Sequence, residues 1–294
     1  MSTEQVSTPA IAFLGVGQMG TPMATRLITA GFNVRVWNRS KTRLQDLVQL
    51  GGIEASTPAA AATGADVVIT MLPDGAATEN VMEGTDGAFA TLANGALWLQ
   101  MGTIGIEWTD RFQGSSADHR VVLVDAPVSG SVLPASVGQL LILASGPTDS
   151  HPLAERIFQT LGRETFWLGE AGAGSRAKLV LNNWLVDLVE LTAETIKVST
   201  ALGLDPRRVV DILTDAPIGS PYAVAKARTM LDGDFSPNFA LKHAFKDAGL
   251  ALDAARSVDI ELALTESLMS TWQRAVADGA GDEDLSVVYR YVNA

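Results

Sequence analysis

The sequence predicts an α/β protein in which a doubly wound parallel-sheet domain is followed by an all-helical domain. Strand-like and helix-like patterns alternate through the first half, which is typical of a parallel sheet with helices on both faces. Beyond about Gly169 the strand patterns stop and only helical patterns follow. With 294 residues, the chain is long enough to bury the cores of two modest domains.

The strands expected in the first half are short apolar runs, as buried strands of a parallel sheet usually are. Helices are expected between them, including two at about 21–30 and 41–50. The expected strands are residues 11–14, 33–37, 65–71, 97–100 and 121–124.

The second half is expected to be helical, with breaks at glycine and proline residues. Its first helix is long enough to connect two domains at 1.5 Å per residue. We therefore predict a short disordered tail over 1–9, a sheet domain over 10–169 and a helical domain over 170–294. The expected helices are residues 173–202, 206–214, 222–231, 241–257 and 262–277.

A glycine-rich turn links the first expected strand to the first expected helix. Gly15, Gly17 and Gly20 have the spacing Gly-x-Gly-x-x-Gly, and a second strand follows the helix. The first glycine permits a tight turn, the second lets a pyrophosphate approach the backbone, and the third lets the helix pack against its strand. The amides that begin the helix would face the phosphates. The motif predicts a Rossmann-type dinucleotide site, with further contacts from Val16, Gln18 and Met19.

The turn after the second strand distinguishes the two nicotinamide cofactors. A carboxylate roughly 20 residues beyond the glycines would accept hydrogen bonds from the ribose 2′-hydroxyl of NAD. This chain has Asn38, Arg39, Ser40 and Lys41 there, and a guanidinium can bind a 2′-phosphate through two hydrogen bonds. The alternative is a solvated basic turn. We predict that residues 10–169 bind NADP, with NADPH as the reductant.

Composition excludes several other classes of protein. A net charge of −12 argues against a nucleic-acid or anionic-membrane partner, so local charge at Arg35, Arg39, Lys41 and Arg43 would have to attract an anionic cofactor. The absence of cysteine excludes disulfides, thiolate metal sites and cysteine nucleophiles. Without a signal-peptide pattern or an apolar run of about 18 residues, we expect a soluble, cytoplasmic protein.

No metal site is expected, because the three histidines show no ligand spacing. Serine-hydrolase and P-loop motifs are also absent from the sequence. The histidines are His119, His151 and His243.

Ligands of a doubly wound sheet bind beyond the carboxyl ends of its strands, so the residues after each strand are candidates for the site. The segment 125–131 offers hydroxyls and amides, and Ser129 and Gly130 could bind a substrate carboxylate there. A plain serine–glycine turn is the alternative. The residues expected beside the cofactor are Met71, Leu72, Pro73 and Thr103.

Lys178 and Asn182 lie four residues apart, and therefore on one face of the expected helix over 173–202. Most helical lysines are solvated surface charges. Beside the glycine turn, however, this pair predicts a redox enzyme that uses a nicotinamide cofactor. Phe239, Lys246 and Asp247 lie near a charged helix start, where most charges are expected to be solvated.

The glycine turn, the segment 125–131, the helix start with Lys178 and the pair Lys246–Asp247 follow one another in this order. In this the chain resembles the β-hydroxyacid dehydrogenases, which include 3-hydroxyisobutyrate dehydrogenase and the glyoxylate/succinic semialdehyde reductases. The resemblance extends from about Ile11 to Val292 and is closest to the second of these branches. It rests on residues 15–20, 125–131, 172–182 and 246–247, and for the branch on residues 37–40, 129–131, 139–140 and 239–243.

The resemblance implies that Lys178 is the catalytic acid, with Asn182 as its companion near the substrate. It also implies that the helical domain pairs with a second subunit, giving a homodimer or homotetramer. Among the remaining residues, it assigns Ser129 and Gly130 to the substrate carboxylate, Thr103 to cofactor and substrate, Phe239 and Asp247 to the substrate, and Lys246 to the cofactor.

The chain departs from the family pattern in places. Gly102 stands where the family usually has serine, which removes one hydroxyl near the nicotinamide. Val132 and Leu133 replace a basic stretch of the branch, so that loop would be more apolar. Asn183 and Trp184 would reshape the pocket.

The predicted function is NADPH-dependent reduction of a small carboxylated aldehyde, of the glyoxylate or succinic semialdehyde type, or oxidation of the corresponding 3-hydroxyacid. An imine reductase is one alternative, although those enzymes usually carry Asp or Tyr where Lys178 stands. A catalytically silent NADP-binding protein is another, and it would have no need of Lys178 and Asn182.

Overall fold

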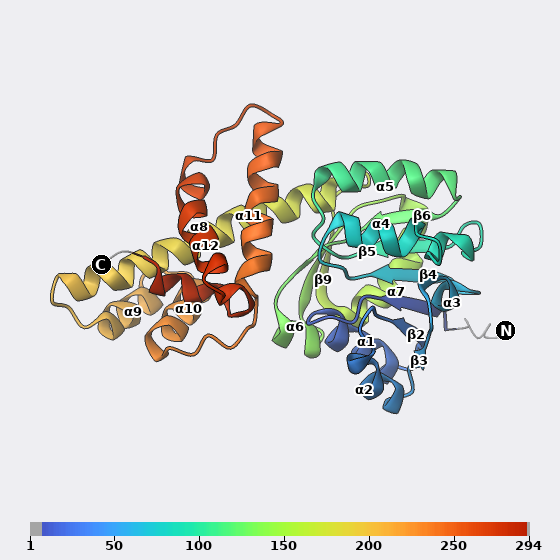
Figure 1. Cartoon of the computed structure of the whole chain (residues 1–294), viewed down its shortest axis with the longest axis horizontal. Coiled ribbons are helices and arrows are strands. Elements are labelled where there is room, and N and C mark those ends of the chain that lie inside the picture. Colours follow the sequence, from blue (N-terminus) through green and yellow to red (C-terminus); the bar gives the residue numbers. More distant parts are fainter. Residues whose placement is uncertain (1–7, 293–294) are drawn as a thin grey trace. The chain divides into compact units, whose positions relative to one another are not determined.

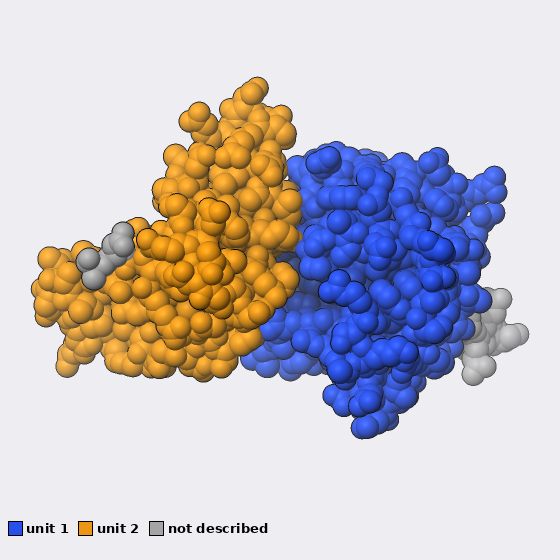
Figure 2. All heavy atoms as spheres, viewed as in Figure 1, with its two compact units in different colours: residues 1–178 blue, residues 179–294 orange. Residues whose placement is uncertain are grey.

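The computed structural model of the protein describes residues 8–292; most of the tail predicted over 1–9, residues 1–7, lies outside the described residues. The chain divides into two compact units, residues 1–178 and 179–294 (Figure 2). The long helix α8 (Ala173–Ala201) carries the chain from one unit into the next.

The first unit contains a six-stranded parallel sheet with the strand order β3-β2-β1-β4-β5-β6. This order confirms the predicted doubly wound sheet, whose direction of winding reverses between β1 and β4. The five predicted strands are all present, with ends displaced by no more than two residues. The strands are β1 (Ala10–Leu14), β2 (Asn33–Trp37), β3 (Ile53–Glu54), β4 (Val67–Thr70), β5 (Leu97–Gln100) and β6 (Val122–Asp125).

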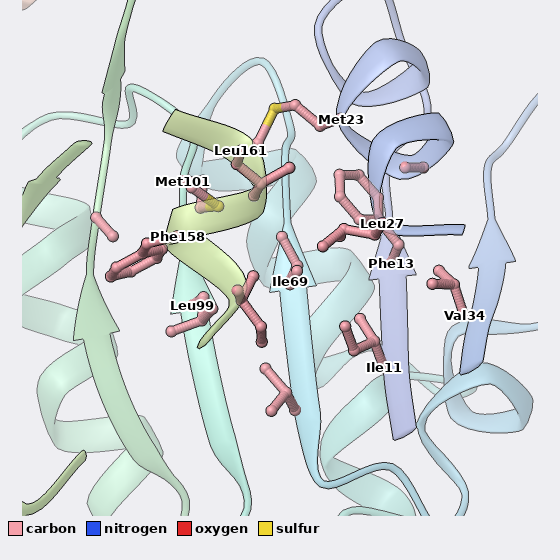
Figure 3. Packing of buried hydrophobic residues seen from close by; sticks show 14 of the residues in the cluster. Ile11, Phe13, Met23, Leu27, Val34, Ile69, Leu99, Met101, Phe158 and Leu161 are labelled. Carbon is pink, nitrogen blue, oxygen red and sulfur yellow. The ribbon is translucent and has the colours of Figure 1, made fainter. Parts of the chain in front are cut away.

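Helices cover both faces of this sheet (Figure 1). Successive residues of a strand point to opposite faces, and in the buried strands the residues on both faces are apolar. On one face, Phe13 packs in a cluster with Leu27 and Phe158 (Figure 3). On the other face, Leu14 belongs to a cluster with Trp98. The helices are α1 (Gly20–Thr29), α2 (Leu44–Gln49), α3 (Pro58–Ala62), α4 (Gly75–Glu83), α5 (Ile106–Asp118), α6 (Val132–Ser136) and α7 (His151–Leu161), with 3₁₀ turns at Lys41–Arg43, Ala88–Ala90 and Thr148–Ser150.

A second, three-stranded sheet was not predicted. It has the order β7-β8-β9, from β7 (Val128–Ser129), β8 (Leu140–Ala144) and β9 (Gly162–Trp167). Strand β9 has exposed Arg163 and Glu164 near its start, so it lacks the apolar run that marks a buried strand. Two expectations are also corrected: residues 41–50 begin as a 3₁₀ turn, and Val132 and Leu133 open α6 instead of lying in a loop.

The second unit is helical, and its helices begin and end within two residues of the predicted positions. Its core gathers around the fully buried Trp272. Within residues 8–292, no helix is both long and apolar enough to cross a membrane. After α8 come α9 (Pro206–Asp215), α10 (Pro221–Asp232), α11 (Leu241–Arg256) and α12 (Ala263–Ala277), with 3₁₀ turns at Ala280–Asp282 and Leu285–Arg290.

Candidate active site

In the glycine-rich turn between β1 and α1, the first and third glycines are closely packed, whereas the space around the second is open. Gly15 has φ +102°, and a Cβ atom there would lie 2.5 Å from the carbonyl oxygen of Met71. A Cβ on Gly20 would collide with the carbonyl of Gly15. Nothing lies within 4 Å of a Cβ placed on Gly17. The backbone is therefore exposed at the second glycine, as a phosphate cradle requires.

The first turn of α1 is held by the same loop. Met19 precedes the helix and provides no side-chain cap, whereas the Thr21 hydroxyl donates to the carbonyl of Gly17 at 2.8 Å. A helix start of this kind carries partial positive charge, which favours an anion. Val16, in the middle of the turn, is fully buried, and Gln18 and Met19 are partly buried.

The turn after β2 places Arg39 at the surface. The Asn38 amide donates to the carbonyl of Ser40 at 2.9 Å, and the Ser40 hydroxyl lies 3.0 Å from that of Thr42. These bonds fix the backbone on both sides of Arg39, whose side chain is exposed.

The basic cluster expected near this turn is smaller than the sequence indicated. Arg35 donates to the carbonyl of Thr63 and so is used within the fold. The Lys41 ammonium lies 3.5 Å from a Glu54 carboxylate oxygen. Sequence reasoning missed Glu54, which ends β3 and pairs in register with Val36 of β2. Its pairing with Lys41 reduces its repulsion of an anion.

The turn after β5 leaves no room for a side chain at Gly102. The side-chain amide of Gln100, a residue that is 1% exposed, forms two hydrogen bonds with the backbone of Gly102. The Gly102 amide donates to Gln100 Oε1 at 2.9 Å, and Gln100 Nε2 donates to the Gly102 carbonyl at 2.8 Å. A Cβ at this position would lie 2.5 Å from the carbonyl of Leu72. This tight turn positions the partly buried Thr103.

Ser129 and Gly130 lie at the edge of the second sheet. Ser129 pairs with Leu141 of β8, and its side chain is partly exposed. Gly130 has φ +135°, and a Cβ there would lie 2.8 Å from Leu140 Cδ2. Only glycine fits this turn without strain. The exposed turn leads directly into α6, where Leu133 is 66% exposed.

Lys178 is not a solvated surface lysine. It is 9% exposed, and Asn182, one turn farther along α8, is 1% exposed. A buried ammonium requires polar or charged groups around it. A lysine–amide pair held inside the protein can act on a bound substrate more readily than a mobile surface side chain.

In the second unit, Asn182 and Asp247 are directly bonded. The Asn182 amide donates to Asp247 Oδ2 at 2.6 Å, and the Lys246 ammonium lies 2.8 Å from Asp247 Oδ1. Asp247 is 3% exposed, so the expectation that most charges in this segment are solvated is wrong for this residue. The carboxylate fixes the orientation of the Asn182 amide, whose oxygen is thereby directed away from Asp247.

Asn183 and Trp184 differ in environment from their neighbour Asn182. Asn183 Oδ1 accepts a hydrogen bond from the buried Thr265 hydroxyl at 2.7 Å, and this hydroxyl also lies 2.8 Å from Asp187 Oδ1. The Asn183 side chain therefore serves packing against α12. Trp184 is 67% exposed.

Phe239 is positioned by a buried aspartate that sequence reasoning missed. Asp284 is fully buried and accepts the Phe239 amide at 3.2 Å. Its carboxylate also receives the Lys226 ammonium at 2.7 and 2.8 Å and the Ser286 hydroxyl at 2.6 Å. Burial alone would raise the pKa of Asp284, but Lys226 and these hydrogen bonds outweigh it and hold the pKa below its usual range.

Two of the histidines have packing roles. His119 stacks on Phe89 with ring centres 4.3 Å apart, and His151 stacks on Trp167 at 3.4 Å. His243 is partly buried, and burial together with Lys242 and Lys246 lowers its pKa. Within residues 8–292 no three metal-binding side chains come together.

Two family models cover nearly the whole chain. The NAD binding domain of 6-phosphogluconate dehydrogenase matches residues 10–169. The NAD-binding domain of NADP-dependent 3-hydroxyisobutyrate dehydrogenase matches residues 172–292. The chain belongs to the β-hydroxyacid dehydrogenase family. It is an NAD(P)-dependent dehydrogenase, in agreement with the cradle at Gly17.

Several relatives match along nearly the whole of this chain. Glyoxylate/succinic semialdehyde reductase 2 of Arabidopsis thaliana is 33% identical over 99% of this chain and 81% of its own. The 3-sulfolactaldehyde reductase of Escherichia coli is 34% identical over 96% and 95%. Among solved structures, 3-hydroxyisobutyrate dehydrogenase of Mycobacterium tuberculosis with L-serine superimposes with a TM-score of 0.87 and 28% identity, covering 98% of this chain and 100% of that one.

Proposed function

We propose that the protein reduces a small carboxylated aldehyde with NADPH, and can oxidise the corresponding hydroxyacid in the reverse direction. The observation that carries this proposal is the buried pair of Lys178 and Asn182 on one face of α8. Burial of a charge is costly unless it is compensated, so a buried ammonium beside a buried amide suits a site where charge develops on a substrate. The similarity to semialdehyde and sulfolactaldehyde reductases supports the same substrate class.

The turn at Gly15, Gly17 and Gly20 fits a dinucleotide, because side chains would fill or distort it at the first and third glycines. When bound, NADPH supplies the hydride. Lys178 stabilises the negative charge that develops on the carbonyl oxygen and donates the proton to it. Asn182, held by Asp247, orients the reacting oxygen.

Ser129 and the amide of Gly130 are proposed to bind the substrate carboxylate. An exposed turn with a hydroxyl and backbone N–H groups supplies the donors that a carboxylate accepts. Thr103 and Phe239 are proposed to contact the substrate, and Met71, Leu72, Pro73 and Lys246 the cofactor.

An NADPH-oxidation assay with four compounds tests the substrate class: glyoxylate, succinic semialdehyde, methylmalonate semialdehyde and a cyclic imine. We expect at least one carboxylated aldehyde to be the best substrate. Preferred turnover of the imine would instead support the imine-reductase alternative, which the apolar Val132 and Leu133 also suit. No oxidation with any compound would favour a silent binding protein.

Replacing Arg39 with aspartate is expected to abolish or reverse a preference for NADPH over NADH of at least about tenfold in kcat/KM. Tenfold corresponds to about 1.4 kcal/mol, which one charge-assisted bidentate contact to the 2′-phosphate can supply. Steady-state kinetics with both cofactors checks this. Arg163→Asp makes the same charge change at an exposed position of β9 and should leave the ratio unchanged. Equal efficiency with NADH and NADPH in the unmodified protein would contradict the assignment.

We further propose that the protein is a homodimer or homotetramer joined through the helical unit. Leu191 and Val198 are 57% and 53% exposed and lie seven residues apart on one face of α8, and Leu202, which directly follows the helix, is 73% exposed. A row of exposed apolar side chains on one long helix suits a second copy of the same surface. Light scattering should give two or four times the 30.9 kDa of one chain. A single-chain mass at micromolar concentration would overturn this proposal.

A further inference from the structure

A buried hydrogen-bond network joins the end of β6 to the start of α8. Asp125 is fully buried, and its Oδ2 accepts the Ser175 amide at 2.7 Å while its Oδ1 accepts the Ser175 hydroxyl at 2.7 Å. The Ser145 hydroxyl, 3.3 Å from Asp125 Oδ2, accepts the Gly174 amide at 2.9 Å. Thr109 Oγ1 of α5 lies 3.1 Å from Ser175 Oγ.

These contacts cap α8 from outside its own sequence. The first N–H groups of a helix have no partner within the helix. Here the amides of Gly174 and Ser175 are satisfied by side chains that lie 29 and 50 residues earlier. Gly174 permits this close approach, because a Cβ there would lie 2.9 Å from the carbonyl oxygen of Asp125 and still closer to that of Leu143.

A buried carboxylate at this place is costly for the fold. Burial raises the pKa of Asp125, and the hydrogen bonds from Ser175 and Ser145 only partly oppose that effect. A neutral cap such as serine, threonine or asparagine would satisfy the helix amides as well. The carboxylate differs from these caps because its two oxygens bind the Ser175 amide and hydroxyl at once.

Within the first unit, Asp125 is connected to two parts of the proposed site: the helix that carries Lys178 and the Ser129–Gly130 turn. Ser175 precedes Lys178 by three residues and shares its side of α8. Asp125 precedes Ser129 by four residues, and its backbone pairs with Ser145 in both directions at 3.0 and 2.8 Å. The chain that leads to the Ser129–Gly130 turn and the helix that carries Lys178 are thus fixed to one carboxylate.

We propose that Asp125 is a positioning residue that, through Ser175 and the first turn of α8, holds Lys178 in register with the Ser129–Gly130 turn. This inference rests on the proposed function, in which Lys178 donates the proton and Ser129 binds the carboxylate. Misplacement of a reacting group by about 1 Å can cost on the order of a hundredfold in rate.

Asp125→Ala removes both oxygens that bind Ser175. We expect its kcat to fall by about tenfold to a hundredfold, with NADPH affinity within about twofold of the unmodified protein. Asp125→Asn should retain most of the activity, because the asparagine oxygen can accept the Ser175 amide and its NH₂ can donate to the Ser175 hydroxyl. Ser175→Ala, which removes the hydroxyl link, should lower kcat in the same direction and replaces Asp125→Ala if that variant does not fold. Asp205→Ala is the matched control, because Asp205 caps α9 through the Arg207 amide at 3.0 Å and should leave kcat unchanged.

A double-mutant cycle with Lys178→Ala separates positioning from a merely structural role. If Asp125 acts by placing Lys178, its substitution has little further effect on kcat once Lys178 is absent. The same loss of kcat in both backgrounds, or a kcat within twofold of normal in folded Asp125→Ala and Ser175→Ala, would overturn the inference. Failure of the proposed function is a different result, in which Lys178→Ala alone retains normal turnover.

Discussion

Replacing Lys178 with alanine is expected to lower kcat by about 10²- to 10⁴-fold, the usual contribution of general acid catalysis. The substitution removes both the proton donor and the positive charge that stabilises the developing alkoxide. NADPH binding should be nearly unchanged, because in the proposed site the glycine turn and Arg39 would hold the part of the cofactor far from the nicotinamide. Asn182→Ala should cost less, since the amide orients the substrate and does not supply the proton.

Single-turnover NADPH oxidation, together with fluorescence titration of NADPH, measures both effects. Lys197→Ala is a suitable control, because Lys197 lies on the same helix and packs over Tyr289 with its ammonium 4.6 Å from the ring centre. Its turnover should equal that of the unmodified protein. Near-normal turnover in Lys178→Ala would mean that Lys178 has no part in the chemistry.

Replacing Asp284 with alanine is expected to destabilise the second unit by about 3–5 kcal/mol, the typical loss when one partner of a buried ion pair is removed. The Lys226 ammonium, whose side chain is 9% exposed, would remain without its carboxylate. The amides of Asn238, Phe239 and Ser286 would lose their acceptor as well. For a protein of this size the loss corresponds to a fall in Tm of roughly 10 °C.

Differential scanning calorimetry of Asp284→Ala and Asp282→Ala provides the comparison. Asp282 forms an exposed ion pair with Lys242, and exposed pairs contribute little to stability, so Tm should hardly change in that variant. Because the pKa of Asp284 is lowered in the folded protein, its contribution is present above the unfolded pKa of about 3.9 and is lost as the pH falls through the lower folded value. Equal Tm values for the two variants at neutral pH would contradict this role of Asp284.

The main sheet and the helical unit could be predicted because each leaves a strong local pattern. The runs at residues 11–14 and 97–99 are continuously apolar, as strands buried on both faces usually are. The second sheet could not be predicted in this way. Its first strand, β7, contains two residues, and the exposed start of β9 resembles a loop.

The candidate site was predicted only where a motif is local. The spacing of Gly15, Gly17 and Gly20, and of Lys178 and Asn182, can be read directly from the sequence. The roles of Asp125 and Asp284 depend on partners 50 and 58 residues away in the sequence, which no local pattern reveals. The two hydrogen bonds between Gln100 and Gly102 were missed for another reason. A glutamine after an apolar run gives no sign that both the oxygen and the nitrogen of its side chain bind the backbone.

The central claim is that the protein directs hydride to an aldehyde that carries a carboxylate. Its most direct test compares kcat/KM for succinic semialdehyde and butanal at saturating NADPH, since butanal has the same chain with a methyl group in place of the carboxylate. One charge-assisted set of hydrogen bonds contributes about 1.5–3 kcal/mol, so succinic semialdehyde should be favoured by roughly 10- to 150-fold. Equal or better turnover of butanal would contradict the account.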